Sequence, residues 1–195
     1  MIGRMRWVAA LMLFAAACAQ AQDADWLRMW EGAQRQRPRT IGATSRIAPP
    51  NEPGTPLVIH GRVFARDGRT PARDVTVFAY QTDHTGVYNA PGASGWRLQG
   101  WARTDAEGRF TFQTIRPASY PSGRNPQHVH LTIEGPNLPR RWTPELHFLD
   151  DPFVSEADKR ESQSLGAFGP VRPVTTRNGT QHVDFHIRIA DEGRF

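Results

Sequence analysis

The chain has 195 residues, with 24 basic and 19 acidic side chains and a formal net charge of +5. This length suits one domain with a hydrophobic core of its own. The 17 glycines, 16 prolines and 38% hydrophobic residues favour many turns and short strands over long helices. The basic residues form no stripe and are not interleaved with aromatic residues, so we expect no nucleic-acid partner.

The first 21 residues have the layout of a secretory signal peptide. A basic start is followed by an apolar run from Val8 to Ala17, and Ala19-Gln20-Ala21 offers small residues for cleavage. Lipidation at Cys18 is the less favoured alternative, because Ala15 stands where a bulky residue usually precedes such a cysteine. We therefore expect export to the periplasm or the medium, and a mature chain with no cysteine and no transmembrane segment.

Residues 22–55 read as an N-terminal arm or linker. Asp25 to Gln36 predicts a short helix, and the stretch from Ala48 to Gly54, with three prolines, is typical of extended chain. Residues 56–195 then form the single main domain that we expect.

Within that domain the pattern is that of short strands between turns. Residues 150–165 form a polar excursion with at most a helical turn. The predicted fold is all-β, a single β-sandwich of short, mainly antiparallel strands with an extended N-terminal arm. The expected strands are Leu57–Phe64, Asp74–Gln81, Arg109–Ile115, His128–Glu134, Leu146–Phe148 and His182–Ile189.

His128 and His130 are the first candidates for chemistry. Alternate residues of a strand share a face, so both imidazoles can converge while Val129 turns into the core. Such a pair is often only two polar surface histidines. Tyr120, at the start of the preceding Pro/Gly loop, could fold back toward them. Two imidazoles suit several metals, whereas tyrosine ligands indicate ferric iron, because a phenol with a pKa of about 10 needs a strong Lewis acid to stay ionised.

Several motifs, taken together, resemble the intradiol ring-cleavage dioxygenases, and most closely the protocatechuate 3,4-dioxygenase type. The resemblance covers roughly residues 56–152. Its motifs are Gly61-Arg62-Val63, the turn ending at Tyr88, Thr104 to Phe110, Thr114 to Pro121, and His128-Val129-His130.

The resemblance implies an Fe(III) ion held by Tyr88, Tyr120, His128 and His130, and no organic cofactor. It also implies an oxidoreductase that cleaves a catechol-type ring between its two hydroxyls with O2, giving a cis,cis-muconate-type product. Tyr120 would then be catalytic as well as a ligand, taking up a proton from the substrate. The third tyrosine, Tyr80, is expected to pack in its strand.

Two positions near the expected centre depart from the family pattern. Relatives carry an arginine three residues before the first histidine, where this chain has Asn125, so Arg124 is the candidate for that catalytic charge. Relatives of the protocatechuate type carry a glutamine where this chain has Glu145. Both are candidates for contacts around the metal ligands, and they bear on which aromatic is the substrate.

A competing interpretation is a non-enzymatic, exported β-sandwich that serves as a binding module. It accounts for the strands and the export signal, but not for two tyrosines and two histidines in matching motifs. A homo-oligomer is compatible with either interpretation.

Overall fold

The computed structural model describes residues 25–89 and 93–190, and the expected signal peptide and Cys18 lie outside them. The chain divides into two compact units, residues 1–37 with 91–96, and residues 38–90 with 97–195. In the first unit the predicted helix is present over residues 25–35, and Gln36 Nε2 donates a hydrogen bond to the carbonyl oxygen of Ser94 (3.0 Å). No described helix is long and apolar enough to cross a membrane.

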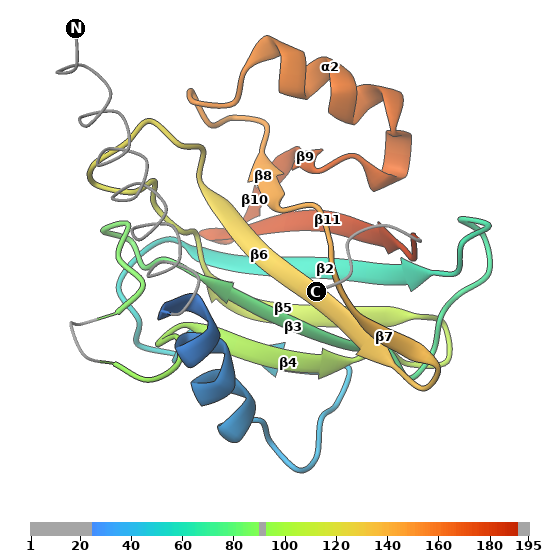
Figure 1. Cartoon of the computed structure of the whole chain (residues 1–195). Coiled ribbons are helices and arrows are strands. Elements are labelled where there is room, and N and C mark those ends of the chain that lie inside the picture. The colour runs from blue at the N-terminus through green and yellow to red at the C-terminus, as the bar shows by residue number, and fades with distance from the viewer. Residues whose placement is uncertain (1–24, 90–92, 191–195) are drawn as a thin grey trace, which may run out of the picture. The chain divides into compact units, whose positions relative to one another are not determined.

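The second unit is built from two mixed β-sheets (Figure 1). One sheet has the strand order β1-β5-β2-β11-β10, and the other has the order β4-β3-β6-β8-β9 with β7 paired to β6. The strands are β1 Thr44–Arg46, β2 Pro56–Phe64, β3 Thr76–Gln81, β4 Gln99–Arg103, β5 Arg109–Ile115, β6 His128–Gly135, β7 Leu138–Trp142, β8 Leu146–Phe148, β9 Val171–Arg172, β10 Val174–Arg177 and β11 Thr180–Arg188.

Alternation along the strands explains the core. In β2, Leu57, Ile59, Gly61 and Val63 are buried, whereas the alternate residues are partly or fully exposed. Buried apolar residues of both sheets, such as Phe112 of β5 and Leu131 of β6, belong to one cluster. The β-rich expectation is therefore confirmed. The pairing is more mixed than expected, because β1 with β5, β2 with β11, and β8 with β9 run parallel.

The polar excursion contains a true helix, α2 (Glu156–Ser164), longer than the single turn that the sequence suggested. It begins with a capping box, in which the side chain of Ser155 accepts from the Asp158 amide and the side chain of Asp158 accepts from the Ser155 amide. The buried Ser162 ties it to β9, because its Oγ accepts from the amide of Val171 (2.9 Å) and donates to the carbonyl of Val171 (3.2 Å).

Candidate metal centre

The two histidines of β6 lie as the strand period requires. Val129 between them is fully buried, and the Nε2 atoms of His128 and His130 are 3.1 Å apart with ring centroids 4.6 Å apart. A second histidine pair, His60 and His182, has the same nitrogen separation of 3.1 Å but centroids 5.5 Å apart in nearly coplanar rings. The His60 and His182 rings therefore meet end to end, as in a hydrogen bond. The His128 and His130 rings are bent toward a common point, as two ligands of one ion are.

Tyr88 reaches this point from a tight turn after β3. Asp83 organises the turn, since its Oδ1 accepts from the amides of Thr85 (2.8 Å) and Val87 (3.1 Å). The turn is also tied to the segment after β5, because the Ala118 amide donates to the Asp83 carbonyl (3.0 Å) and Thr82 Oγ1 donates to the Ala118 carbonyl (2.7 Å). These hydrogen bonds hold the two tyrosine-bearing segments together without any contribution from a metal.

Tyr120 is held by its own loop. Its amide donates to Oδ1 of Asn125 (2.9 Å), and the Gly123 amide donates to the Tyr120 carbonyl (3.2 Å). Asn125 Nδ2 also donates to the carbonyl of Pro126 (3.2 Å). The side chain of Asn125 therefore closes the loop that presents Tyr120, which is a conformational role that a turn-forming asparagine can fill.

All four predicted ligands come together at one point. Tyr88 Oη lies 2.8 Å from Tyr120 Oη, 2.7 Å from His130 Nε2 and 3.3 Å from His128 Nε2. Tyr120 Oη lies 3.0 Å from His128 Nε2. Burial raises the pKa of the Tyr88 phenol far above its ordinary value, and its hydrogen bond with Tyr120 raises it further; burial also raises the pKa of Tyr120. Burial lowers the pKa of His128 and so keeps that imidazole neutral, the form in which it can bind a metal.

Several known proteins share sequence and fold with this chain. The sequence model of a family described as "Dioxygenase" matches residues 38–167. The chain belongs to the intradiol ring-cleavage dioxygenase family. It is 31% identical over 137 residues to the protocatechuate 3,4-dioxygenase beta chain of Burkholderia cepacia, covering 64% of this chain and 58% of that one. It is 28% identical over 128 residues to catechol 1,2-dioxygenase 2 of Acinetobacter lwoffii, covering 56% and 46%. The chain thus spans about half the length of these curated relatives.

Solved structures share the fold of this intradiol family member. The dioxygenase domain of a dioxygenase carbohydrate-binding protein fusion from Streptomyces sp. SirexAA-E superposes with a TM-score of 0.59 at 24% identity, covering 78% of this chain and 90% of that one. The 3-chlorocatechol 1,2-dioxygenase of Rhodococcus opacus 1CP gives a TM-score of 0.58 at 21% identity, covering 77% and 67%.

Behind the histidines, each Nδ1 atom has a partner. His128 Nδ1 lies 2.7 Å from the carbonyl oxygen of Pro126, and His130 Nδ1 lies 2.9 Å from Oε1 of Glu145. Because both acceptors require Nδ1–H, they leave the Nε2 lone pairs directed at the phenols. Hydrogen bonds from His130 and then His147 lower the pKa of Glu145, so its carboxylate is ionised.

Glu145 also lies within 4.8 Å of the ligand atoms of His128 and His130, and these three residues are a possible metal-binding group by themselves. The carboxylate, however, contacts the Nδ1 edge of His130, whereas the phenols contact the Nε2 edge. We therefore place Glu145 behind His130 and the phenols in front of it. Tyr80 completes the support, since its buried ring stacks on His130 with centroids 4.5 Å apart, as its expected packing role requires.

Sequence reasoning missed the contacts that fix the start of β6. The buried Asp151 accepts from the Gln127 amide at 2.6 Å, one residue before His128. Arg116 donates from Nε to Oε1 of Gln127 (2.6 Å) and from both terminal nitrogens to Asp150 (2.8 and 2.7 Å). Its guanidinium also lies over the ring of Phe148, 4.5 Å from the centroid. The only sequence signal was Asp150-Asp151 before Pro152, which is typical of a solvated turn.

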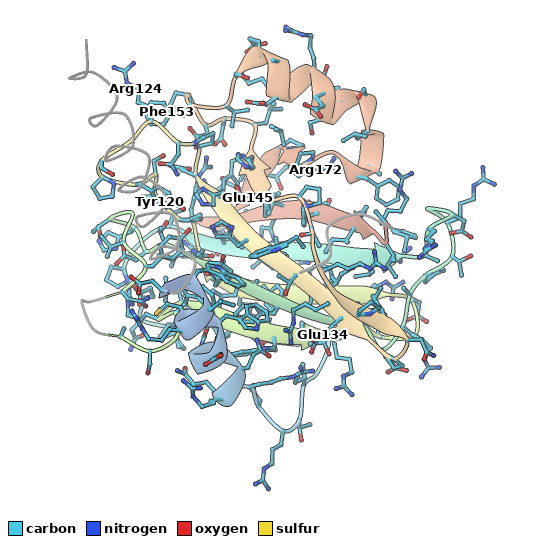
Figure 2. All side chains as sticks on the ribbon, viewed as in Figure 1. Tyr120, Arg124, Glu134, Glu145, Phe153 and Arg172 are labelled. Carbon is cyan, nitrogen blue, oxygen red and sulfur yellow. The ribbon has the colours of Figure 1, made fainter. Side chains whose placement is uncertain are left out.

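Arg124 is not brought to the centre. It is exposed, makes no hydrogen bond or ion pair with the described residues, and lies on the outside of its loop, away from Tyr120 (Figure 2). Its catalytic role stays a prediction, which would require the loop to change conformation.

Gly86 sets how closely the two tyrosine segments approach, and we expect Gly86→Ala to separate them. Its φ is +83°, and an added Cβ would collide with the carbonyl oxygen of Ser119, next to Tyr120. The strain should cost about 1–3 kcal/mol of stability, measured by thermal or urea unfolding, and bound iron should fall as the phenols move apart. Gly166→Ala is the matched control, because Gly166 also has a positive φ (+59°) but open space around its Cβ. Equal iron content in the two variants would contradict this role of Gly86.

Proposed function

We propose that this chain is a non-haem Fe(III) dioxygenase that cleaves a catechol-type aromatic ring between its two hydroxyls. O2 adds both of its atoms, and the product is a cis,cis-muconate-type dicarboxylate. The observation that carries the proposal is the convergence of two phenol oxygens and two imidazole nitrogens, with contacts of 2.7 to 3.3 Å around Tyr88 Oη. Membership of the intradiol family supports the same reaction.

The donor set suits a ferric ion. Burial raises the pKa of both phenols, so neither would ionise at neutral pH without a strong Lewis acid beside it. Tyr88, Tyr120, His128 and His130 would hold the ion, and none of them is a cysteine or a carboxylate of the kind that zinc sites draw on. When bound, ferric iron would supply the charge that keeps both phenols ionised and the redox chemistry that couples a catechol to O2.

The protein's own contribution is orientation and proton transfer. Tyr88 Oη contacts all three other donor atoms, whereas Tyr120 Oη contacts Tyr88 and His128. Tyr120 Oη therefore has fewer contacts with the other donor atoms than Tyr88 Oη has. We therefore assign Tyr120 Oη as the acceptor of a proton from the incoming catechol hydroxyl.

Export, domain division and fold class belong to the same proposal. We infer that residues 1–21 direct export to the periplasm or the medium and are removed, that residues 22–55 form an arm, and that residues 56–195 form the enzyme domain. We also infer that the two sheets pack as a β-sandwich, which their shared apolar cluster supports. A homo-oligomer is compatible with this arrangement, and mass measurement of the purified protein tests it.

Colour tests the centre, and O2 uptake tests the reaction. Iron-loaded protein should be burgundy, because tyrosinate-to-iron(III) charge transfer absorbs in the visible, and anaerobic catechol should shift the band to longer wavelength. With air, one O2 should be consumed per catechol as the absorbance of a muconate appears. A protein that stays colourless after iron reconstitution would contradict the proposed metal centre. A coloured protein that consumes no O2 with catechol, protocatechuate or hydroxyquinol would contradict the proposed reaction but not the metal centre.

Glu145 orients His130 in this scheme, and we expect Glu145→Leu to lower iron affinity by about 10- to 100-fold. Glu145→Gln keeps an acceptor for His130 Nδ1 but removes the charge, so its loss should be smaller. The measurement is iron retention against a chelator, with the visible band followed in parallel. Glu107→Gln is the control, since Glu107 is exposed and its carboxylate pairs with Arg109 (3.6 Å), far from His130 in the sequence. Equal retention in Glu145→Leu and Glu107→Gln would contradict the assignment.

A further inference from the structure

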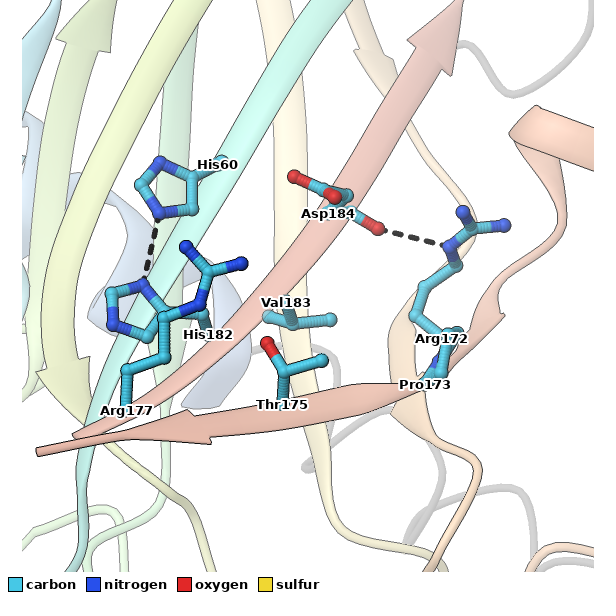
Figure 3. Close-up of a pocket in the computed structure, with 8 residues that line it drawn as sticks. All are labelled: His60, Arg172, Pro173, Thr175, Arg177, His182, Val183 and Asp184. Carbon is cyan, nitrogen blue, oxygen red and sulfur yellow. Dashed lines mark hydrogen bonds between the residues drawn. The ribbon is translucent and has the colours of Figure 1, made fainter. Parts of the chain in front are cut away.

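A cavity of about 220 Å³ is lined mainly by residues of β2, β10 and β11 in the five-stranded sheet (Figure 3). One lining residue, Arg172 of β9, comes from the sheet that carries the candidate metal centre. Strand register brings its lining together. Asp184 of β11 lies opposite His60 of β2, and Thr175 of β10 lies opposite His182 of β11. Arg172 of β9 closes another side, just before the chain passes through Pro173 into β10.

Arg172 is fixed in position without being neutralised. Its Nε donates to the carbonyl oxygen of Asp184 (2.9 Å), and its Nη1 donates to the carbonyl oxygen of Gly166 (3.0 Å). Both acceptors are backbone carbonyls, so the guanidinium keeps its full charge and has further N–H groups to offer. A guanidinium held in this way is preorganised for an anion.

Arg177 adds a second guanidinium, which is not paired with any described residue. It is exposed and has no hydrogen bond or ion pair among the described residues, and the Asp184 carboxylate has none either. The two arginines and one aspartate leave the cavity with a net charge of 2 − 1 = +1 when its histidines are neutral. The charge is not cancelled internally, because neither arginine pairs with that carboxylate.

The histidine pair supplies another donor. His60 Nε2 and His182 Nδ1 are 3.1 Å apart and share one hydrogen bond. Whichever ring donates, the second neutral imidazole keeps one more N–H, on His182 Nε2 or on His60 Nδ1. With the hydroxyl of Thr175, the cavity combines two guanidiniums, an imidazole N–H and an O–H.

We propose that this cavity is a binding site for a small oxyanion, a phosphate or carboxylate group, separate from the metal centre. Guanidinium groups make short, charge-assisted hydrogen bonds to such oxygens. The Asp184 carboxylate limits the affinity and disfavours ligands with more than one closely spaced negative charge. The proposal does not depend on the proposed dioxygenase activity.

The test is calorimetric titration of the purified protein with inorganic phosphate and, separately, with acetate. Tighter binding of phosphate identifies a phosphate group as the ligand, and tighter binding of acetate identifies a carboxylate. Arg177→Met should weaken the preferred anion about tenfold, whereas Asp184→Asn should strengthen it several-fold. Arg39→Met, which removes the same charge from an exposed arginine outside the cavity, should change affinity less than twofold.

Two outcomes would overturn the proposal. One is the absence of binding by either anion at 10 mM, a concentration of the order expected for a weak surface site. The other is an equal effect of Arg177→Met and Arg39→Met, which would mean general charge attraction. The visible band of the iron-loaded protein, recorded at the same anion concentrations, distinguishes this site from an anion bound at iron. Binding at iron would change the band, whereas binding in the cavity would leave the band unchanged.

Discussion

His128→Ala should give a folded protein that retains no iron and is colourless after reconstitution. His128 is 6% exposed, and its Nε2 lies 3.0 to 3.3 Å from both phenol oxygens and 3.1 Å from His130 Nε2. Loss of a side chain that supports a ligand costs about 10- to 100-fold in metal affinity, so loss of the ligand itself should exceed 100-fold. The measurement is iron content after dialysis against a chelator, together with O2 uptake.

His84→Ala is the control for this variant. His84 is exposed in the turn before Tyr88, so the change removes an imidazole of the same size without removing a donor from the centre. We expect iron content and activity close to those of the unaltered protein. Circular dichroism of both variants distinguishes lost iron from lost structure. A folded His128→Ala protein with unchanged iron would overturn the ligand assignment.

The histidine half of this centre was predictable from local pattern. The strict alternation of β6 places His128 and His130 on one face and buries Val129, and the structure has this arrangement. The tyrosines were predictable only through resemblance, because Tyr88 and Tyr120 lie in irregular segments whose course depends on contacts between the two loops. The two-residue alternation of a strand does not predict the course of an irregular loop, so it does not predict where Tyr88 and Tyr120 point.

The same distinction holds for the fold. Strands with clear alternation, such as β2, β5 and β11, were predicted close to their observed bounds. The strands that were not predicted, β1, β4, β7, β9 and β10, have five residues or fewer, and in β4 three consecutive residues are buried. Helix α2 has one buried residue, Ser162, so no apolar stripe marked it, and its capping box was the available signal.

The contacts around the ligands could not be read from the sequence for a related reason. Asp151 lies 24 residues after Gln127, and Arg116 lies 34 residues before Asp150, so each contact exists only once the sheets have formed. Glu145 departs from the glutamine of relatives in sequence, but its contact with His130 depends on the pairing of β8 with β6, which sets His147 opposite His128.

The Tyr120→Phe variant should lose most of its activity but retain most of its iron. It therefore distinguishes a role in proton transfer from a role in metal binding. The change removes Oη but leaves the ring and the other three proposed ligands, Tyr88, His128 and His130. A positioned proton acceptor contributes about 10²- to 10⁴-fold to a rate, so turnover should fall within that range. The visible band should weaken or move, because one of two tyrosinates is lost.

Tyr88→Phe should behave differently, because Tyr88 Oη contacts all three other donor atoms. We expect it to lose more iron than Tyr120→Phe does under the same chelator. Tyr80→Phe is the control for both, since it makes the same chemical change in a ring that packs on His130 at 4.5 Å. Its band and turnover should stay within a few-fold of the unaltered protein. If Tyr120→Phe kept full turnover, Tyr120 would be a ligand only, and the proton acceptor would have to be sought elsewhere in the centre.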